Sequence, residues 1–160
     1  MTIDDLNHLD PESAEAAFTR CCGSTAWARA MAAARPYASP EAMANAGDAI
    51  WRSLAPGDWL EAFAAHPRIG ERATSTWSAQ EQARAMETGA AAHARLVAGN
   101  RAYEDRFGYT FIVCATDKSG DEILTTLEER LHHEPADELQ IAADEQRKIT
   151  ELRLNKLITA

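Results

Sequence analysis

The chain has 160 residues, 25 acidic and 16 basic, so its formal net charge is −9. This length is typical of one domain with a single core. The acidic excess, without any run of lysine or arginine, argues against nucleic acid and anionic membranes as partners.

The cysteines and the N-terminal sequence indicate a reducing compartment. Cys21 and Cys22 are adjacent and Cys114 is remote, which gives no paired disulfide framework. The first residues, "MTIDDLNHLDPES", lack the basic and apolar regions of a signal peptide, and no apolar run approaches the roughly 20 residues that span a bilayer. We therefore expect a cytoplasmic protein that does not associate with membranes.

The first half of the chain predicts a series of helices. Asp10 is a plausible N-cap with Pro11 in the first turn of "DPESAEAAFTRC", and "STAWARAMAAA" follows it. A third helix is expected to begin near Ser39-Pro40 and to run through "EAMANAGDAIWRSL". Alanine, leucine and glutamate dominate these segments, as expected for α structure.

A shorter fourth helix, "PGDWLEAFAAH", is predicted to end at Pro67, because proline disfavours the α conformation at His66 before it. His66 would then stand at a helix end facing an irregular loop. Its near-neutral pKa makes it a candidate acid–base catalyst, although such a histidine can also simply cap carbonyls or interact with the helix dipole. Arg68 and Arg72 give the following loop an anion-friendly edge; the alternative is a solvated surface charge, which we favour for Arg72.

The segment "SAQEQ" predicts the start of the next helix, which is expected to run to about Val97. Ser78 and Glu81 have the spacing of a capping box, so the Glu81 carboxylate can simply reach back to the Ser78 N–H. The same geometry would place Ser78, Glu81 and Gln82 at a helix N-terminus, where anion binding is favoured.

A second capping signal, "SGDE" at residues 119–122, predicts a helix that Pro135 ends. Between the two capped helices lies "RFGYTFIVCAT", the one β-like segment of the sequence. Without a partner strand it is expected to be a buried irregular connection, whose backbone N–H groups a polar ligand can satisfy. The whole pattern predicts an all-α, single-domain helical bundle over residues 1–160, with about seven to nine helices and this one buried extended segment.

The last helix, "ADELQIAADEQRKITELRLNKLI", places an arginine on its apolar face. At 100° per residue, Leu139, Ala142, Ile149 and Leu157 fall within about 40° of Arg153, and Gln146 shares that face. A guanidinium on a buried face needs a carboxylate or an anionic ligand to compensate its charge. Arg153 is therefore a candidate anion-binding residue.

Other chemistries have little support in the sequence. His132 and His133 would point about 100° apart on a helix, and no HExxH or CxxC spacing is present, so we expect no metal site. Cys114 lies in the most apolar stretch, which is typical of a core residue and not of a nucleophile. No glycine-rich nucleotide motif is present.

Four motifs in order, "HPRIG", "SAQEQ", "FGYTFIVCA" and "EQRKITELRLNKL", resemble those of the ureidoimidazoline decarboxylases of urate degradation. That family acts on 2-oxo-4-hydroxy-4-carboxy-5-ureidoimidazoline (OHCU). The segment "RPYAS" and the region around Trp27 are also similar to the family, so the resemblance covers nearly the whole chain.

The resemblance implies a cofactor-free, commonly dimeric enzyme that converts OHCU, a small anionic substrate, to (S)-allantoin and CO2. It implies that His66 is the catalytic histidine, Glu81 its acidic partner and Arg153 the substrate-binding arginine. Further ligand contacts are implied at Pro67, Ser78 and Gln82 and along the backbone of Phe111, Ile112, Val113, Cys114 and Ala115.

The sequence departs from the family pattern at Thr110, where proline is frequent, and at Thr116, where a basic residue is frequent. Two alternatives stay open from the residues themselves. One is a cofactor-free hydrolase or tautomerase of a related ureido heterocycle. The other is a helical binding module in which His66, Glu81 and Arg153 only cap helices and form ion pairs.

Overall fold

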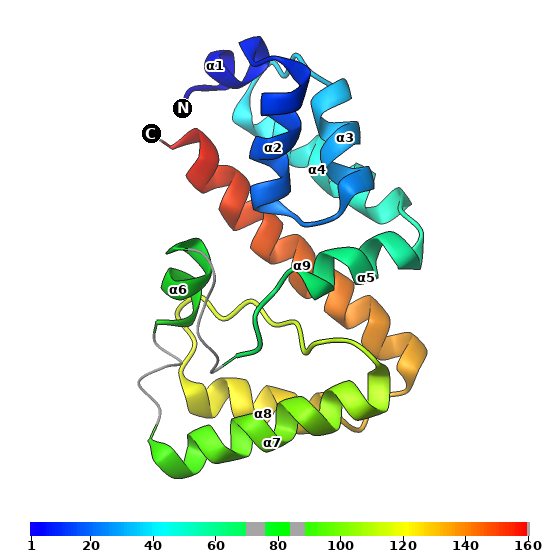
Figure 1. Cartoon of the computed structure of the whole chain (residues 1–160), viewed down its shortest axis with the longest axis vertical. Helices are drawn as coiled ribbons and strands as arrows, with labels where there is room; N and C mark the ends of the chain where they lie inside the picture. The colour runs from blue at the N-terminus through cyan, green and yellow to red at the C-terminus, as the bar shows by residue number, and fades with distance from the viewer. Residues whose placement is uncertain (70–75, 84–88, 160) are drawn as a thin grey trace. The chain divides into compact units, whose positions relative to one another are not determined.

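The structure, a computed structural model, describes residues 1–69, 76–83 and 89–159 (Figure 1). Within these residues the regular elements are all helices: α1 (Ile3–His8), α2 (Pro11–Cys21), α3 (Thr25–Ala33), α4 (Pro40–Ser53), α5 (Pro56–Ala64), α6 (Thr76–Gln82), α7 (Ala90–Phe107), α8 (Gly120–Arg130) and α9 (Pro135–Ile158). The predicted all-α class is confirmed. None of these helices combines the length and apolarity needed to cross a membrane.

Three of the predicted helix starts are confirmed by their caps. The side chain of Asp10 accepts a hydrogen bond from the Ser13 N–H at 2.9 Å, that of Ser39 from Ala42 at 3.0 Å, and that of Ser119 from Glu122 at 3.2 Å. Each satisfies a backbone donor that the first helical turn leaves without a partner. Helix α1 was not predicted; it begins with a reciprocal capping box between Thr2 and Asp5.

The capping box predicted at Ser78 is wrong. Helix α6 begins at Thr76, so Ser78 lies inside the helix instead of at its N-cap, and Glu81 stands near the C-terminal end. The predicted continuous helix to Val97 is also wrong, because α6 ends at Gln82 and α7 begins separately. Gly89 is the N-cap of α7, with an extended backbone (φ −65°, ψ 163°) that a helix interior does not allow.

Other helix ends differ from the prediction by a few residues. Helix α5 ends at Ala64, two residues before His66. Helix α7 continues through residues 106 and 107, which the sequence assigned to the extended segment, and ends where Gly108 adopts a left-handed conformation (φ 82°) and donates to the Glu104 carbonyl at 2.8 Å. Helix α8 ends at Arg130, and Pro135 is instead the first residue of α9.

The chain divides into two compact units. Unit 1 comprises residues 1–62 and 146–160, and unit 2 comprises residues 63–145. In unit 1, the Phe18 ring meets Trp27 and Tyr37 edge-on, with centroids 6.0 and 6.4 Å apart. Gly47 of α4 lets this aromatic core close, because a Cβ there would stand 3.3 Å from both Trp27 and Leu154. The prediction of a single domain stays a prediction.

In unit 2, α7 and α8 pack side by side and run in the same direction (Figure 1). Two contacts agree with this direction. Arg95, in the first half of α7, pairs with Glu128 of α8, and Arg106, near the end of α7, donates to the His133 carbonyl just beyond the end of α8. Residues 108–119 therefore return along the pair before α8 begins. This returning segment holds the predicted extended stretch, whose side chains enter the core formed by Ile69, Leu96, Tyr103, Phe111, Val113, Ala115, Ile123, Leu124 and Leu127.

Candidate active site

His66 follows the end of α5 and is held by its backbone. Its N–H donates to the Phe63 carbonyl at 3.2 Å, which continues the helical turn for one more hydrogen bond. The Phe63 ring packs on Tyr109 with centroids 5.3 Å apart, which ties this corner to the returning segment of unit 2. His66 and Pro67 are both half-buried. The predicted place of His66 beside a helix end is thus confirmed.

The anion-friendly edge predicted after His66 is not supported by Arg68. Its guanidinium binds the Glu104 carboxylate in a bidentate manner, with Nε–Oε1 and Nη2–Oε2 distances of 2.5 and 2.9 Å. The positive charge of this guanidinium is therefore already compensated by a carboxylate, which weakens its attraction for a second anion. Arg72 lies outside the described residues.

Helix α6 brings Ser78, Glu81 and Gln82 onto one face, because residues three and four positions apart are neighbours on a helix. Ser78 and Gln82 are both 5% exposed, whereas Glu81 is half-buried. The predicted place of these three side chains at a helix N-terminus is wrong, and their association in a site stays a prediction. Ser78 and Gln82 are therefore buried polar side chains of α6, and not residues of its N-terminal cap.

The segment 111–115 lies close enough to α6 for their charges to interact. Burial raises the pKa of the Cys114 thiol, and the carboxylates of Glu145 and Glu81 raise it further. Phe111, Ile112, Val113 and Ala115 are each at most 4% exposed. This segment is therefore the buried irregular connection that the sequence predicted, and it has Glu81 in its electrostatic surroundings.

Arg153 belongs to unit 1, where α9 presents it as a buried side chain, 8% exposed. Its predicted place on the apolar face is confirmed by the burial of Ala142, Ile149 and Leu157 on the same helix. Burial raises the pKa of Cys22 to about 11, and the Arg153 guanidinium acts in the opposite direction. Arg153 therefore lies near Cys21, the last residue of α2, and Cys22, which follows it.

Two neighbours of Arg153 had no assigned role in the sequence analysis. Gln146 is fully buried and its amide donates to the Thr150 hydroxyl at 3.1 Å, one turn along α9. Both side chains share the face that carries Arg153. Helical periodicity predicted that Gln146 lies on this face. Thr150 could not be singled out from the sequence, because threonine at a half-polar position is common in ordinary helices.

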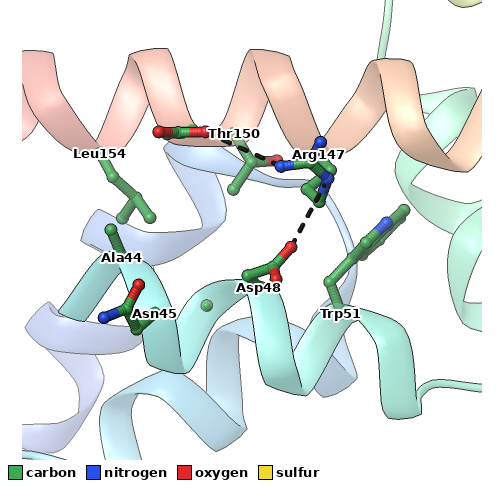
Figure 2. A pocket seen from close by; sticks show the side chains of 9 residues that line it. Ala44, Asn45, Asp48, Trp51, Arg147, Thr150 and Leu154 are labelled. Carbon is green, nitrogen blue, oxygen red and sulfur yellow. Dashed lines mark ion pairs between the residues drawn. The ribbon is translucent and has the colours of Figure 1, made fainter. Parts of the chain in front are cut away.

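Unit 1 also contains a cavity of about 200 Å³ along α4 and α9, shown in Figure 2. There the Arg147 guanidinium lies between two carboxylates, 3.5 Å from Asp48 and 3.9 Å from Glu151. Its charges are thus compensated within the cavity wall, and none of the predicted site residues lines it. The lining consists of Ala44, Asn45, Gly47, Asp48, Trp51, Arg147, Thr150, Glu151 and Leu154.

The described residues contain no group of three or more His, Cys, Asp or Glu side chains that could hold a metal ion. In particular, His133 lies beside Glu138, 3.7 Å from Nδ1 to Oε2, without a third such ligand.

Residues 7–155 match the protein family described as OHCU decarboxylase. The chain belongs to the OHCU decarboxylase family. Its relatives include the uric acid degradation bifunctional protein TTL of Arabidopsis thaliana, 41% identical over 147 residues. That alignment covers 87% of this chain and 45% of the Arabidopsis protein, so the chain spans less than half of that relative's length.

Two further OHCU decarboxylase relatives match over nearly their whole length. The 2-oxo-4-hydroxy-4-carboxy-5-ureidoimidazoline decarboxylase of Haloferax volcanii is 27% identical, with 96% of this chain and 94% of that protein covered. A crystal structure of OHCU decarboxylase in the presence of (S)-allantoin is 37% identical, with a TM-score of 0.84, and the match covers 95% of this chain and 100% of that chain. The all-helical OHCU decarboxylase fold is therefore shared.

Proposed function

We propose that this protein is a cofactor-independent carboxy-lyase that converts OHCU to (S)-allantoin and CO2 in urate degradation. The observation that carries the proposal is the family match over residues 7–155, which includes His66, Glu81 and Arg153. The shared face of Ser78, Glu81 and Gln82, in the electrostatic surroundings of segment 111–115, supports it.

The chemistry follows from the substrate. The carbon that loses CO2 adjoins a ring C=N, so OHCU supplies its own sink for the electron pair of the broken C–C bond. In our proposal His66 takes the proton of the C4 hydroxyl, the carboxylate leaves as CO2, and the electron pair of the broken bond passes to the ring C=N to form an enol-like intermediate. Two protons convert this intermediate to allantoin, one at the ring nitrogen and one at the neighbouring carbon. His66 returns one of them and solvent supplies the other. Positioned acid–base groups typically contribute about 10²- to 10⁴-fold each.

The other site residues bind and orient the substrate in this proposal. Glu81 and Gln82 hold the ring and the ureido group and take part in proton transfer, with Ser78 and Pro67 as further contacts. Arg153 binds an anionic or carbonyl part, for which a buried guanidinium is suited. Backbone groups within segment 111–115 supply the remaining contacts.

We further infer a cytoplasmic homodimer in which residues 1–160 form a single domain. The family resemblance supports the dimer, and the net charge of −9 supports a partner set without nucleic acid or anionic membranes. Sedimentation equilibrium at micromolar concentration is the measurement that decides between monomer and dimer.

The test of the proposed function is stereochemical. OHCU generated freshly from urate by urate oxidase and hydroxyisourate hydrolase should give optically active (S)-allantoin in the presence of the protein, because spontaneous decay gives a racemate. We expect His66→Ala and Glu81→Ala to lower the rate of enzymatic (S)-allantoin formation at least about 10²-fold. His93→Ala, which changes an exposed histidine of α7, is the matched control and should leave the rate unchanged.

The circular dichroism signal of the product follows the reaction directly, and far-ultraviolet circular dichroism checks that each variant is folded. Racemic product at the uncatalysed rate with wild-type protein would leave the helical binding module as the better interpretation. A fully active His66→Ala or Glu81→Ala variant would refute the assigned roles while sparing the activity.

A further inference from the structure

The backbone of segment 111–115 is held on one side by two buried charged side chains of unit 2. Arg130 donates from Nη1 to the Ile112 carbonyl at 2.6 Å. Glu145 of α9 accepts from the Cys114 N–H, with a distance of 3.2 Å to Oε1. These two backbone groups are therefore already used by the protein and are not available to a ligand.

Both side chains are themselves fixed. Arg130 is 4% exposed, is ion-paired with the fully buried Glu138, and lies over the Phe111 ring with its guanidinium carbon 4.5 Å from the centroid. Glu145 is 7% exposed, and the Lys118 ammonium stands 3.8 Å from its Oε1. Groups held in this way can define the position of a segment that has no partner strand.

The pattern of side chains shows which backbone groups face the other way. Phe111, Val113 and Ala115 enter the core of unit 2, and this alternation is typical of an extended chain. In an extended chain the carbonyl of one residue and the N–H two residues later point to the same side, and the groups of the residue between point to the opposite side. The Val113 N–H and carbonyl therefore face away from Arg130 and Glu145.

The Val113 backbone groups make no hydrogen bond with any residue in the described parts of the chain, although Val113 is only 4% exposed. Buried backbone groups are nearly always paired, so these two have the character of a ligand-binding pair, one donor and one acceptor. A ureido or cyclic amide group presents the complementary acceptor and donor.

We propose that Glu145 and Arg130 are positioning residues of the decarboxylase: they fix the Cys114 and Ile112 side of the segment so that the Val113 N–H and carbonyl meet the amide groups of the substrate. This inference rests on the proposed function. Glu145 acts through the backbone of Cys114 and does not contact the substrate. Misplacement of binding groups by about 1 Å can cost roughly 10²-fold in rate.

A matched pair of conservative variants separates the hydrogen bond from the charge. Glu145→Asp keeps the carboxylate but shortens its reach by one methylene, so the Cys114 N–H loses its acceptor. Glu145→Gln keeps an oxygen at the same reach but removes the charge and the attraction to Lys118. We expect kcat/KM for OHCU to fall about 10- to 10²-fold in Glu145→Asp and to stay within about 3-fold of wild type in Glu145→Gln.

Amide hydrogen exchange and nuclear magnetic resonance report on segment 111–115 itself, independently of the overall stability of the protein. The Cys114 amide should exchange faster in Glu145→Asp than in wild type or Glu145→Gln, at matched melting temperature. Addition of (S)-allantoin should shift the Val113 amide signal in wild type and Glu145→Gln, and much less in Glu145→Asp. Asp144→Asn, at an exposed neighbouring position of α9, is the charge-loss control.

Equal kinetics in all three variants, or equal damage in Glu145→Asp and Glu145→Gln, would overturn the positioning role. So would the absence of any Val113 shift in wild-type protein that produces (S)-allantoin. Failure of the wild type to produce (S)-allantoin is a different result, because it refutes the proposed function itself, while exchange at Cys114 still reports whether Glu145 holds the segment.

Discussion

Arg153 is a buried guanidinium, and its surroundings must compensate its positive charge. It is 8% exposed, and burial of a cation is unfavourable unless hydrogen bonds and an opposite charge compensate it. Guanidinium and ammonium groups are not equivalent in such a place, because only the planar guanidinium offers two parallel donors to a carboxylate or carbonyl. The choice of arginine at this position is therefore itself an indication of planar recognition.

We predict that Arg153→Lys raises KM for OHCU at least about 10-fold, because the positive charge stays while the bidentate geometry is lost. Initial rates of (S)-allantoin formation measure the effect. Arg147→Lys is the control on the same helix, since Arg147 lines the separate cavity of Figure 2 and pairs there with Asp48. Equal changes of KM in both variants would show that charge on α9, and not recognition at residue 153, sets the affinity.

The sequence predicted some of these residues and could not predict others, for physical reasons. Arg153 could be predicted because helical periodicity shows a charged residue on an apolar face. The same signal was present for Arg130, which follows Ile123 and Leu127 at helical spacing, and it was not used. Glu145 could not be found in this way, because its role depends on the position of the Cys114 N–H, which local sequence does not determine.

At the scale of elements, three helices with side-chain caps were predicted correctly, whereas α1, which also begins with a side-chain cap, was not predicted. Asp10, Ser39 and Ser119 begin helices because their side chains satisfy free N–H groups. Ser78 has the same local spacing, but it is buried inside α6. The burial of Ser78 comes from tertiary packing, which overrides the local preference and cannot be read from four residues.

The parallel pair α7 and α8 depends on one glycine. A Cβ at Gly99 would stand 2.5 Å from Leu127 Cδ2, and Leu127 is fully buried, so its side chain has little room to move. We predict that Gly99→Ala lowers the free energy of unfolding by about 1–2 kcal/mol, since overpacking costs more than the improved helix propensity returns. Urea unfolding followed by circular dichroism measures the change.

Gly57→Ala in α5 is the matched comparison, because a Cβ there meets no atom within 4 Å. It should leave stability unchanged or raise it by up to about 1 kcal/mol, the gain expected from helix propensity alone. If Gly99→Ala were as stable as Gly57→Ala, the close approach of α7 and α8 would have to relax at no cost.

At the scale of the whole molecule, buried protonated groups in both units link stability to alkaline pH. Burial raises the pKa of Cys21 from an ordinary value near 9 to about 12 and that of Cys22 to about 11. Burial also raises the pKa of Tyr37 to about 12, and raises that of Tyr103 in unit 2. The folded chain therefore keeps protons that the unfolded chain releases above about pH 9.

The sign of the effect follows from proton linkage. Above about pH 9 the unfolded state binds fewer protons than the folded state, so the free energy of unfolding falls as pH rises, until the folded groups titrate near pH 11 to 12. Each fully shifted thiol contributes up to about 1.4 kcal/mol per pH unit within this window. We predict that the urea midpoint is nearly constant from pH 7 to 8.5 and falls steeply from pH 9 to 10.5, under reducing conditions.

Cys21→Ala tests the assignment, because alanine removes one titrating group from the window. Its stability at pH 7 should be lower than that of wild type, since a buried side chain is truncated, but its midpoint should fall less steeply with pH. The decline should not vanish, because Cys22 and the tyrosines still contribute. A slope equal to that of wild type would mean that Cys21 titrates normally and that the alkaline loss of stability has its origin in the other buried groups.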